Sequence, residues 1–452
     1  MELKNKRVLV VGLGKSGLAA ALFLRDRGAR VTVSDTRSAK DLANEIPALL
    51  EAGIMVESGG HGLLTFRRQD LIVVSPGVPL DTPEVAQAQT FGLPVIGELE
   101  LASRFLQGEV VAITGSNGKT TTTTLVGKIF ADAGLATLVG GNIGLPVVEL
   151  VEQTTAETWS VLEVSSFQLE TTVEFRPKIA LVLNITPDHL DRHKTFERYA
   201  AAKTKITEQQ GADDFLVLNA EDKPTQMVAA HTKAQIYWFS SARRIKQGAF
   251  VYGESVFWLA NEGRKAEPVL PVAEIPLRGA HNVENVLAAV CAAKLAGISS
   301  ETIRASVATF HAVEHRLERV RTLGGVEYYN DSKATNVDAT LKALASFTGG
   351  IHLILGGKDK NSDYTLLMPL VRERVAAVYT IGSAAEKIER ELAGVVKMVS
   401  AGTLANAVSL SAADAKPGDT VLLAPACSSF DQFENYEHRG RVFRECVMAL
   451  KE

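Results

Sequence analysis

The sequence predicts an α/β protein of three blocks, each built on a largely parallel sheet. Its 452 residues exceed what one hydrophobic core organises, so two to four domains are expected. Short β-branched runs alternate with longer amphipathic stretches three times along the chain, as in βαβ units. Two glycine-rich loops each follow such a run directly. We place the domain boundaries near residues 97 and 311, which gives expected domains at 1–97, 98–311 and 312–452.

The first block shows the βαβ pattern most simply. Each β-branched run ends at a Gly, Asp or Ser/Pro, and a helix-like segment, Leu18–Arg27, separates the first two. This order predicts a parallel sheet with helices on its faces. The runs are Arg7–Val11, Arg30–Ser34 and Asp70–Ser75.

The second and third blocks repeat the pattern. A helix is expected after Asn282, because apolar residues recur there at helical spacing before Gly297. The stretch from about 235 to 275 is rich in β-forming residues and is expected to be a small β element of the middle domain. The predicted strands are Val110–Thr114, Trp159–Val164 and Ile179–Asn184 in the second block, and 325–329, 351–355, 378–381 and 420–424 in the third.

Composition argues against several classes of partner. With 48 basic and 52 acidic side chains the net charge is only -4, so neither nucleic acid nor an anionic membrane is expected as the main partner. The N-terminus lacks the pattern of a signal peptide, and no run approaches the roughly 20 apolar residues that span a bilayer. Cys291, Cys427 and Cys446 lack metal-ligand spacing and are expected to be reduced thiols, so we expect a cytoplasmic protein.

The segment Thr114–Thr121, Thr-Gly-Ser-Asn-Gly-Lys-Thr-Thr, is the most informative motif. It follows the run Val110–Thr114 and precedes a predicted helix at Thr120–Phe130. Glycines let backbone N–H groups converge on a phosphate, and the start of a helix adds positive potential. Lys119 would reach the terminal phosphates and the Thr120 hydroxyl a bound Mg²⁺. The spacing is that of a shortened P-loop, Gly-x-x-Gly-Lys-Thr.

The N-terminal loop, Gly12-Leu-Gly14-Lys-Ser-Gly17, is less specific. It follows a strand, and Asp35 ends the next strand at the distance typical of a ribose-binding acid. A dinucleotide-dependent oxidoreductase is one interpretation, another nucleotide diphosphate is a second, and a structural βα turn is a third.

Further motifs give the chain a family resemblance. The order and spacing of these motifs resemble those of the Mur ligases of peptidoglycan precursor synthesis, from about residue 7 to 445. Within that family, the motifs Asn330–Asn336 and Pro425–Phe433 resemble those of the D-glutamate-adding members. The motifs are Gly141–Gly144, Glu163–Glu170, Asn184–Asp191, Tyr199–Lys203, Gly279–Asn285, His315–Glu318, Asn330–Asn336 and Pro425–Phe433.

The resemblance implies an N-terminal Rossmann-like domain for a UDP-sugar, a central P-loop ATPase domain and a C-terminal Rossmann-like domain for an amino acid. The expected substrates are UDP-N-acetylmuramoyl-L-alanine and D-glutamate, and no nicotinamide is needed. The residues implied for the UDP-sugar are Gly14, Lys15, Ser16, Asp35, Thr36, Arg37, Ser75, Pro76, Gly77 and Asn142.

The family chemistry joins a carboxylate to an amine through an acyl phosphate and a tetrahedral intermediate, with ATP and Mg²⁺ as cofactors. The resemblance implies Lys119, Glu163, His189 and Lys203 as catalytic residues, and Thr120, Glu163, His189 and Lys203 as holders of two Mg²⁺ ions. Lys203 would act as a carbamylated lysine, because carbamylation gives it the oxygen ligands that Mg²⁺ prefers. In isolation, Glu163 and Lys203 would be solvent-facing and His189 structural.

The resemblance also implies the remaining contacts. D-glutamate would meet His189, Lys333, Thr335, Lys360, Ser429 and Tyr436, with Lys358 as the alternative to Lys360 and with Tyr436 where phenylalanine is expected. Two lysines suit a dicarboxylate. The residues implied for ATP are Gly115, Ser116, Asn117, Gly118, Lys119, Thr120, Thr121, Asn282, Asn285, Arg316 and Asp331.

Other functions remain as alternatives. An oxidoreductase leaves the phosphate loop, Glu163 and Lys203 without a role. A nucleotide-driven switch would hydrolyse ATP without any amino acid, and a sibling ligase would add another amino acid, or glutamate to folate. No Asp-Asn-Pro-Arg motif of the diaminopimelate- or lysine-adding type occurs in the third block. We expect a monomer without membrane insertion, whose domains close on its ligands.

Overall fold

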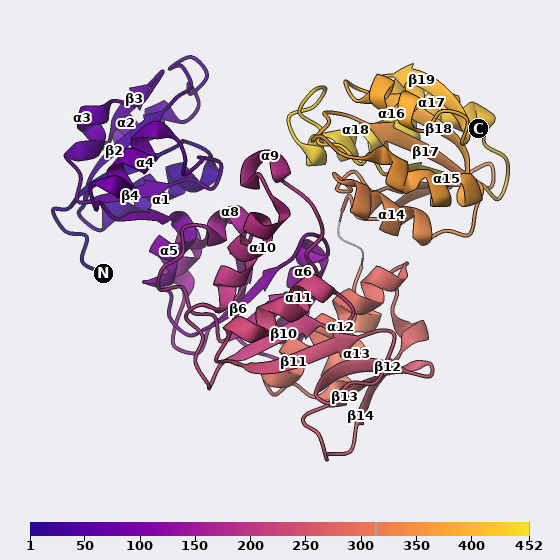
Figure 1. Cartoon of the computed structure of the whole chain (residues 1–452), viewed down its shortest axis with the longest axis horizontal. Helices are drawn as coiled ribbons and strands as arrows, with labels where there is room; N and C mark the ends of the chain where they lie inside the picture. The colour runs from indigo at the N-terminus through magenta and orange to yellow at the C-terminus, as the bar shows by residue number, and fades with distance from the viewer. Residues whose placement is uncertain (312–313, 452) are drawn as a thin grey trace. The chain divides into compact units, whose positions relative to one another are not determined.

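The computed structural model describes residues 1–311 and 314–451. The described residues form three sheets, one in each predicted block, which confirms the α/β fold (Figure 1). The chain divides into two compact units, the first of residues 1–185, 195–270 and 287–306, the second of 186–194, 271–286 and 307–452. The first two sheets belong to the first unit and the third sheet to the second. No helix of the described residues is long and apolar enough to cross a membrane.

The first sheet occupies residues 7–97. Its strands are β1 (Arg7–Val11), β2 (Arg30–Asp35), β3 (Met55–Ser58), β4 (Leu71–Val74) and β5 (Val95–Gly97), and its helices are α1 (Lys15–Asp26), α2 (Ile46–Glu51), α3 (Leu63–Arg67), α4 (Pro83–Thr90) and, just after β5, α5 (Glu98–Ser103). All strand pairs are parallel, in the order β3-β2-β1-β4-β5. Helix α1 begins three residues before the predicted Leu18, because Gly14 is its N-cap.

Strand β1 explains why this sheet is buried on both faces. Val8 and Val10 belong to one hydrophobic cluster, and Leu9 and Val11 belong to another. Successive side chains of a strand point to opposite faces, so a parallel sheet covered by helices needs such an apolar run. The strand order reverses at β1, and open α/β sheets bind ligands beyond the carboxyl ends of the strands at such a point.

The second sheet carries the phosphate loop. Its strands are β6 (Glu109–Thr114), β7 (Thr137–Gly141), β8 (Trp159–Glu163), β9 (Ile179–Val182), β10 (Phe215–Asn219), β11 (Gln235–Ser240), β12 (Gly248–Tyr252), β13 (Ser255–Leu259) and β14 (Glu267–Pro271). The helices from β6 to the third sheet are α6 (Lys119–Asp132), α7 (Val147–Leu150), α8 (Ser166–Leu169), α9 (Leu190–His193), α10 (Phe196–Thr204), α11 (Lys223–Val228), α12 (Ala280–Leu295) and α13 (Ser300–Ala308).

The stretch from 235 to 275 elaborates the middle domain, as expected, and it does so by extending this sheet. The order of the nine strands is β14-β13-β12-β11-β10-β9-β6-β8-β7. Strand β12 pairs in parallel with β11 and antiparallel with β13, so the β-rich stretch continues the central sheet outward. The backbone N–H and C=O groups on the outer side of β11 are thereby hydrogen-bonded to β12.

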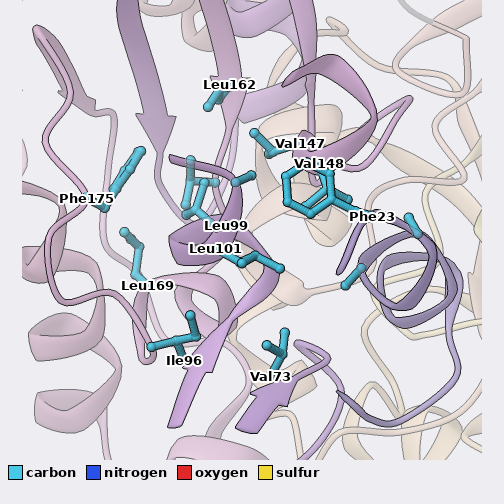
Figure 2. Close-up of a cluster of buried hydrophobic side chains, with 14 of the residues drawn as sticks. Phe23, Val73, Ile96, Leu99, Leu101, Val147, Val148, Leu162, Leu169 and Phe175 are labelled. Carbon is cyan, nitrogen blue, oxygen red and sulfur yellow. The ribbon is translucent and has the colours of Figure 1, made fainter. Parts of the chain in front are cut away.

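A shared hydrophobic core joins the first two sheets within the first unit (Figure 2). Phe23 of α1 and Val73 of β4 lie in the same cluster as Val148 of α7 and Leu162 of β8. Burying one such side chain fully contributes roughly 1.5–3 kcal/mol. The predicted boundary at 97/98 falls between β5 and α5 and stays a prediction.

Helix α5 is also held by a buried carboxylate. Glu100 is fully buried and accepts hydrogen bonds from the backbone N–H groups of Val173, Glu174 and Phe175, with Arg104 as its ion-pair partner at 2.7 Å. A buried charge is costly unless it is paired and hydrogen-bonded in this way. The helix therefore stays attached to the loop that precedes β9.

The third sheet lies in the second unit. Its strands are β15 (Glu318–Leu323), β16 (Val326–Asn330), β17 (Ile351–Gly356), β18 (Val375–Ile381), β19 (Lys397–Gly402) and β20 (Thr420–Leu423), and its helices are α14 (Val337–Ala345), α15 (Met368–Arg374), α16 (Ala385–Glu391), α17 (Leu404–Asp414) and α18 (Tyr436–Ala449). The order is β15-β16-β20-β17-β18-β19, with β15 antiparallel to β16 and the other pairs parallel. The predicted start of the third domain, residue 312, lies outside the described residues.

Candidate active site

The phosphate loop leaves the sheet at the end of β6 and enters α6 at Lys119. Gly118 has φ +86°, a left-handed conformation that favours glycine, and it is the N-cap of α6. Asn184, which follows β9, fixes the loop from the other side: its side chain accepts from Asn117 N at 2.8 Å and donates to Asn117 O at 3.0 Å. Lys119 Nζ donates to the carbonyl oxygens of Gly115 and Ser116 at 2.8 and 3.0 Å.

Glu163 ends β8, the strand next to β6. Thr120 Oγ1 donates to Glu163 Oε2 at 2.7 Å, and Asn142 Nδ2 donates to Glu163 Oε1 at 2.7 Å. Glu163 is 1% exposed, so the solvent-facing alternative for this residue is wrong. Mg²⁺ is usually held by one or two carboxylates, a hydroxyl, phosphate oxygens and water. The carboxylate and hydroxyl beside the phosphate loop fit that donor set, although no group of three acidic, His or Cys ligands occurs among the described residues.

Lys203 lies on α10 and reaches the same loop. Its side chain is 1% exposed, so the solvated-lysine alternative is also wrong. Nζ donates to Gly115 O at 2.9 Å and lies 3.4 Å from Thr114 Oγ1, and it sits over the Tyr199 ring. Tyr199 OH in turn lies 2.9 Å from Ser116 Oγ. The structure thus brings Lys119, Thr120, Glu163 and Lys203 to one edge of the second sheet.

The N-terminal glycine loop is fixed from two sides. Asp35, at the end of β2, accepts from Leu13 N at 2.7 Å, and Arg37 donates to it through its backbone and guanidinium nitrogens. Burial opposes ionisation of Asp35, but these hydrogen bonds and the charge of Arg37 hold its pKa below the usual range. Ser75 Oγ, after β4, donates to Gly12 O at 2.7 Å.

The same loop is linked to the Gly141–Gly144 motif. Lys15 Nζ donates to Gly144 O at 2.5 Å, and Asn142 of that motif contacts Glu163. The residues proposed for the UDP-sugar therefore run in one connected series to the phosphate loop. Gly14 and Ser16 lie at the start of α1, Thr36 follows β2, and Pro76 and Gly77 form the turn after β4.

Gly17 is needed for the shape of this loop. A Cβ at Gly17 would lie 1.9 Å from Gly12 O and 2.6 Å from Ser75 Oγ, whereas a Cβ at Gly14 would meet nothing within 4 Å. Gly17→Ala is expected to destabilise the protein by about 1–3 kcal/mol through overpacking and to raise KM for the UDP-sugar. Thermal unfolding and initial rates measure both effects, and Gly14→Ala is the matched control for the unfolding measurement. Equal unfolding midpoints for the two variants would contradict the expectation.

Three loops of the second unit meet at the carboxyl edge of the third sheet. The strands β16, β20 and β17 are neighbours in that order, and one loop follows each of them. The loop after β16 carries Lys333 and Thr335, the loop after β20 carries Ser429, and the loop after β17 carries Lys358 and Lys360. Lys333 Nζ donates to Tyr436 OH at 2.8 Å, so the hydroxyl that distinguishes Tyr436 from the expected phenylalanine has a partner. Lys358 is exposed and its backbone pairs with Ser428.

Asp188 belongs to the segment 186–194 of the second unit and is a site residue that sequence reasoning did not single out. Its carboxylate accepts from Asn336 Nδ2 at 2.9 Å and pairs with Lys360 Nζ at 3.5 Å. Burial opposes its ionisation, but the charges of Lys360 and His189 and the Asn336 hydrogen bond lower the pKa of Asp188 to about 2. Lys360 and His189 therefore both lie beside the carboxylate of Asp188. Its signal was its position in the Asn184–Asp191 motif.

The other residues proposed for ATP also lie in the second unit. Asn285 Nδ2 donates to Asn282 Oδ1 at 3.0 Å on the first turns of α12. Asp331 follows β16 and accepts from Leu317 N at 3.3 Å. Burial raises the pKa of Asp331 to about 7, against the opposing charge of Arg316. These residues belong to one unit, while Gly115–Thr121 belong to the other.

Three family descriptions match successive parts of the chain. Residues 6–97 match the Mur ligase MurD-like, N-terminal domain, residues 113–293 match the Mur ligase middle domain, and residues 315–427 match the Mur ligase, glutamate ligase domain. The three matches follow the order of the three sheets.

Whole proteins match as well. The chain is 66% identical over 449 residues to the UDP-N-acetylmuramoylalanine--D-glutamate ligase of Acidobacterium capsulatum, covering 99% of this chain and 97% of that protein. It is 58% identical to the protein of the same name from Koribacter versatilis, covering 100% and 99%. The structure of a UDP-N-acetylmuramate-alanine ligase from Thermotoga maritima has the same fold, with TM-score 0.63, 19% identity and coverage of 99% and 100%. The chain therefore belongs to the Mur ligase family.

Proposed function

We propose that this chain is an ATP-dependent ligase that joins D-glutamate to UDP-N-acetylmuramoyl-L-alanine and releases ADP and phosphate. The observation that carries the proposal is the pairing of Thr120 with Glu163 at the end of a phosphate loop that also holds Lys119 and Lys203. The names of the two relatives, which match over 97% and 99% of their length, indicate the substrates. The product is a precursor of peptidoglycan, so the role is in cell wall biogenesis and thereby in cell shape and cell division.

The reaction requires an activated carboxylate. The γ-phosphate of ATP passes to the carboxylate of the UDP-sugar substrate, which gives an acyl phosphate and ADP. The amine of D-glutamate then attacks the acyl carbon, loses a proton, and the tetrahedral intermediate expels phosphate. Both steps bring negative charges together, so preorganised cations and N–H donors stabilise them. Lys119 and the N–H groups of Gly115–Thr121 supply such donors.

Mg²⁺ is the expected cofactor, with two sites. When bound, it would neutralise the charge that develops on the phosphate oxygens. Thr120 and Glu163 would hold it beside the phosphate loop, and His189 and a carbamylated Lys203 would serve the second site. Lys203 lies in a buried position against Gly115, where a carbamate would present oxygen atoms to the loop.

D-glutamate would be bound by Lys333, Thr335, Lys360, Ser429 and Tyr436. His189 would lie close to Lys360, because both side chains contact Asp188. A dicarboxylate fits this group because two ammonium groups and two hydroxyl groups occur on neighbouring loops, and the hydroxyl of Tyr436 is added from the start of α18. Lys360 is preferred to Lys358, since Lys360 contacts Asp188 whereas the side chain of Lys358 is exposed.

The ribose and phosphates of ATP would be bound by Asp331 and Arg316. The adenine would be bound by Asn282 and Asn285. Gly14–Ser16, Asp35–Arg37 and Ser75–Gly77 would hold the uridine diphosphate, with Asn142 near the acceptor. The domains would span 1–97, 98–311 and 312–452, and the protein would act as a monomer in the cytoplasm.

Phosphate release tests the function directly. With ATP, Mg²⁺ and UDP-N-acetylmuramoyl-L-alanine present, release is expected only when D-glutamate is added, and the product should be heavier by one glutamyl residue. L-glutamate and other amino acids are the controls. Release with another amino acid would overturn the D-glutamate pocket but keep the ligase chemistry. Release without any amino acid would indicate a nucleotide-driven switch.

A further inference from the structure

Arg439 is a buried arginine that neither the sequence motifs nor the proposed chemistry uses. It lies on α18, three residues after Tyr436, and its side chain has 0% exposure. Its guanidinium donates to Ser332 Oγ at 2.9 Å, Ser332 O at 2.7 Å, Cys427 O at 3.1 Å and Ser428 O at 3.4 Å. One side chain thus spans two loops that are about a hundred residues apart in sequence.

Those loops are two of the three that carry the proposed D-glutamate contacts. Ser332 precedes Lys333, and Ser428 precedes Ser429. The third loop also approaches: a Cβ at Gly357, which follows β17, would lie 3.1 Å from Arg439 Nη1 and 2.3 Å from Ser428 O. Ser332 Oγ also donates to Tyr436 O at 2.9 Å, so the start of α18 is tied to the same point. The guanidinium therefore bonds two of the three loops and lies close to the third.

The charge of Arg439 is also unusual in its surroundings. All four hydrogen-bond acceptors are neutral, being three carbonyl oxygens and one hydroxyl. A buried guanidinium is ordinarily matched by a carboxylate, because removing an unmatched charge from water is costly. Burial lowers the pKa of Arg439 to about 10, against the opposing influence of Cys427 and Asp431, so the group still carries its charge at neutral pH. The protein therefore holds a buried positive charge against the two loops that Arg439 bonds, with Asp431 as a nearby carboxylate.

We propose that Arg439 is a positioning and specificity-determining residue for the amino-acid substrate. It holds the loops of Lys333, Ser429 and Lys360 in register, and its charge favours a substrate with two carboxylates over an amino acid with an uncharged side chain. A charge in a site that excludes water acts over several ångströms, so no direct contact with the substrate is required. The inference rests on the proposed D-glutamate ligase function.

Kinetics of Arg439→Met and Arg439→Lys test the proposal on the full-length protein. At saturating ATP and UDP-N-acetylmuramoyl-L-alanine, Arg439→Met is expected to raise KM for D-glutamate by about tenfold or more, and Arg439→Lys by less, since lysine keeps the charge. KM for the UDP-sugar should change less than twofold. The preference for D-glutamate over D-glutamine should fall in Arg439→Met, which a loss of packing alone would not cause.

Arg444→Met is the matched control on the same helix, because Arg444 is 55% exposed in its side chain and pairs with Glu318 at 3.2 Å. It should leave both KM values and the preference for D-glutamate unchanged. If Arg439→Met fails to fold, Ser332→Ala takes its place: it removes one acceptor of Arg439 and keeps the charge, so KM for D-glutamate should rise while the preference over D-glutamine is retained.

The outcomes separate the inference from the proposed function. D-glutamate-dependent phosphate release by the unaltered protein is measured first, and its absence overturns both. If the unaltered protein responds to D-glutamate but the folded variants at positions 439 and 332 keep its KM and its preference, the inference about Arg439 is overturned and the ligase function stands.

Discussion

Lys119→Met is expected to lower kcat/KM for D-glutamate-dependent phosphate release by about 10³-fold, the scale of removing a preorganised charge from a phosphoryl-transfer site. Lys119 is the first residue of α6 and its Nζ lies within 3.0 Å of two carbonyl oxygens of the phosphate loop. Methionine keeps the length of the side chain and removes the charge. The effect should fall mainly on kcat, because the charge on the transferred phosphoryl group develops in the transition state.

Lys128→Met is the control for this variant. Lys128 lies on the same helix and pairs on the surface with Asp132 at 2.8 Å, an i,i+4 contact. Such pairs contribute little, so its kinetics and its thermal unfolding should match those of the unaltered protein. A loss of less than tenfold in correctly folded Lys119→Met, measured by initial rates over a range of ATP concentrations, would remove Lys119 from the catalytic group.

The edge that carries the phosphate loop could be predicted from the sequence because its signals are local. The β-branched runs that end at Thr114, Glu163 and Val182 are short, apolar and bounded by glycine or polar residues. Parallel strands bring their carboxyl ends to one edge, so the residues after them become neighbours. The family resemblance implied Glu163 as a Mg²⁺ ligand beside Thr120, and the structure shows the contact between the two side chains.

Strands without such a run were not predicted. Strand β7 contains Gly140 and Gly141 and is mostly half-buried at the edge of the second sheet, and β19 contains Lys397 and Ser400 at the edge of the third. Their strand conformation comes from pairing with β8 and β18, a tertiary effect that overrides local propensity.

Arg439 and Asp188 were missed because their meaning depends on contacts between distant segments. In the sequence, Arg439 stands among other charged residues, Glu437 and Arg441, and is typical of a solvated surface. The available signal was Gly440, since glycine inside a helix commonly marks a close approach. A Cβ there would lie 2.2 Å from His315 Nδ1, so this turn of α18 packs against the chain that leads into the third sheet.

Lys203→Ala is expected to lower kcat by about 10²- to 10³-fold and to recover part of the activity when acetate or formate is added. The reason is the buried position of Lys203, 1% exposed, with Nζ 2.9 Å from Gly115 O. A carbamate on this nitrogen would be an anion with oxygen ligands, and a small carboxylate entering the space left by the side chain would replace it. Initial rates measured against carboxylate concentration give the recovery.

Two comparisons make this expectation specific. Acetate should not restore Lys119→Met, because that variant lacks a cation, so recovery confined to Lys203→Ala distinguishes the two lysines at the same loop. The unaltered protein prepared with isotopically labelled bicarbonate should show a carbamate resonance by NMR that Lys203→Arg lacks, because a guanidinium does not form a stable carbamate. A fully active Lys203→Ala would show that activity needs no group at this position. An inactive variant that no carboxylate restores, together with the absence of that resonance, would assign Lys203 to the support of the phosphate loop alone, through Gly115 and the Tyr199 ring.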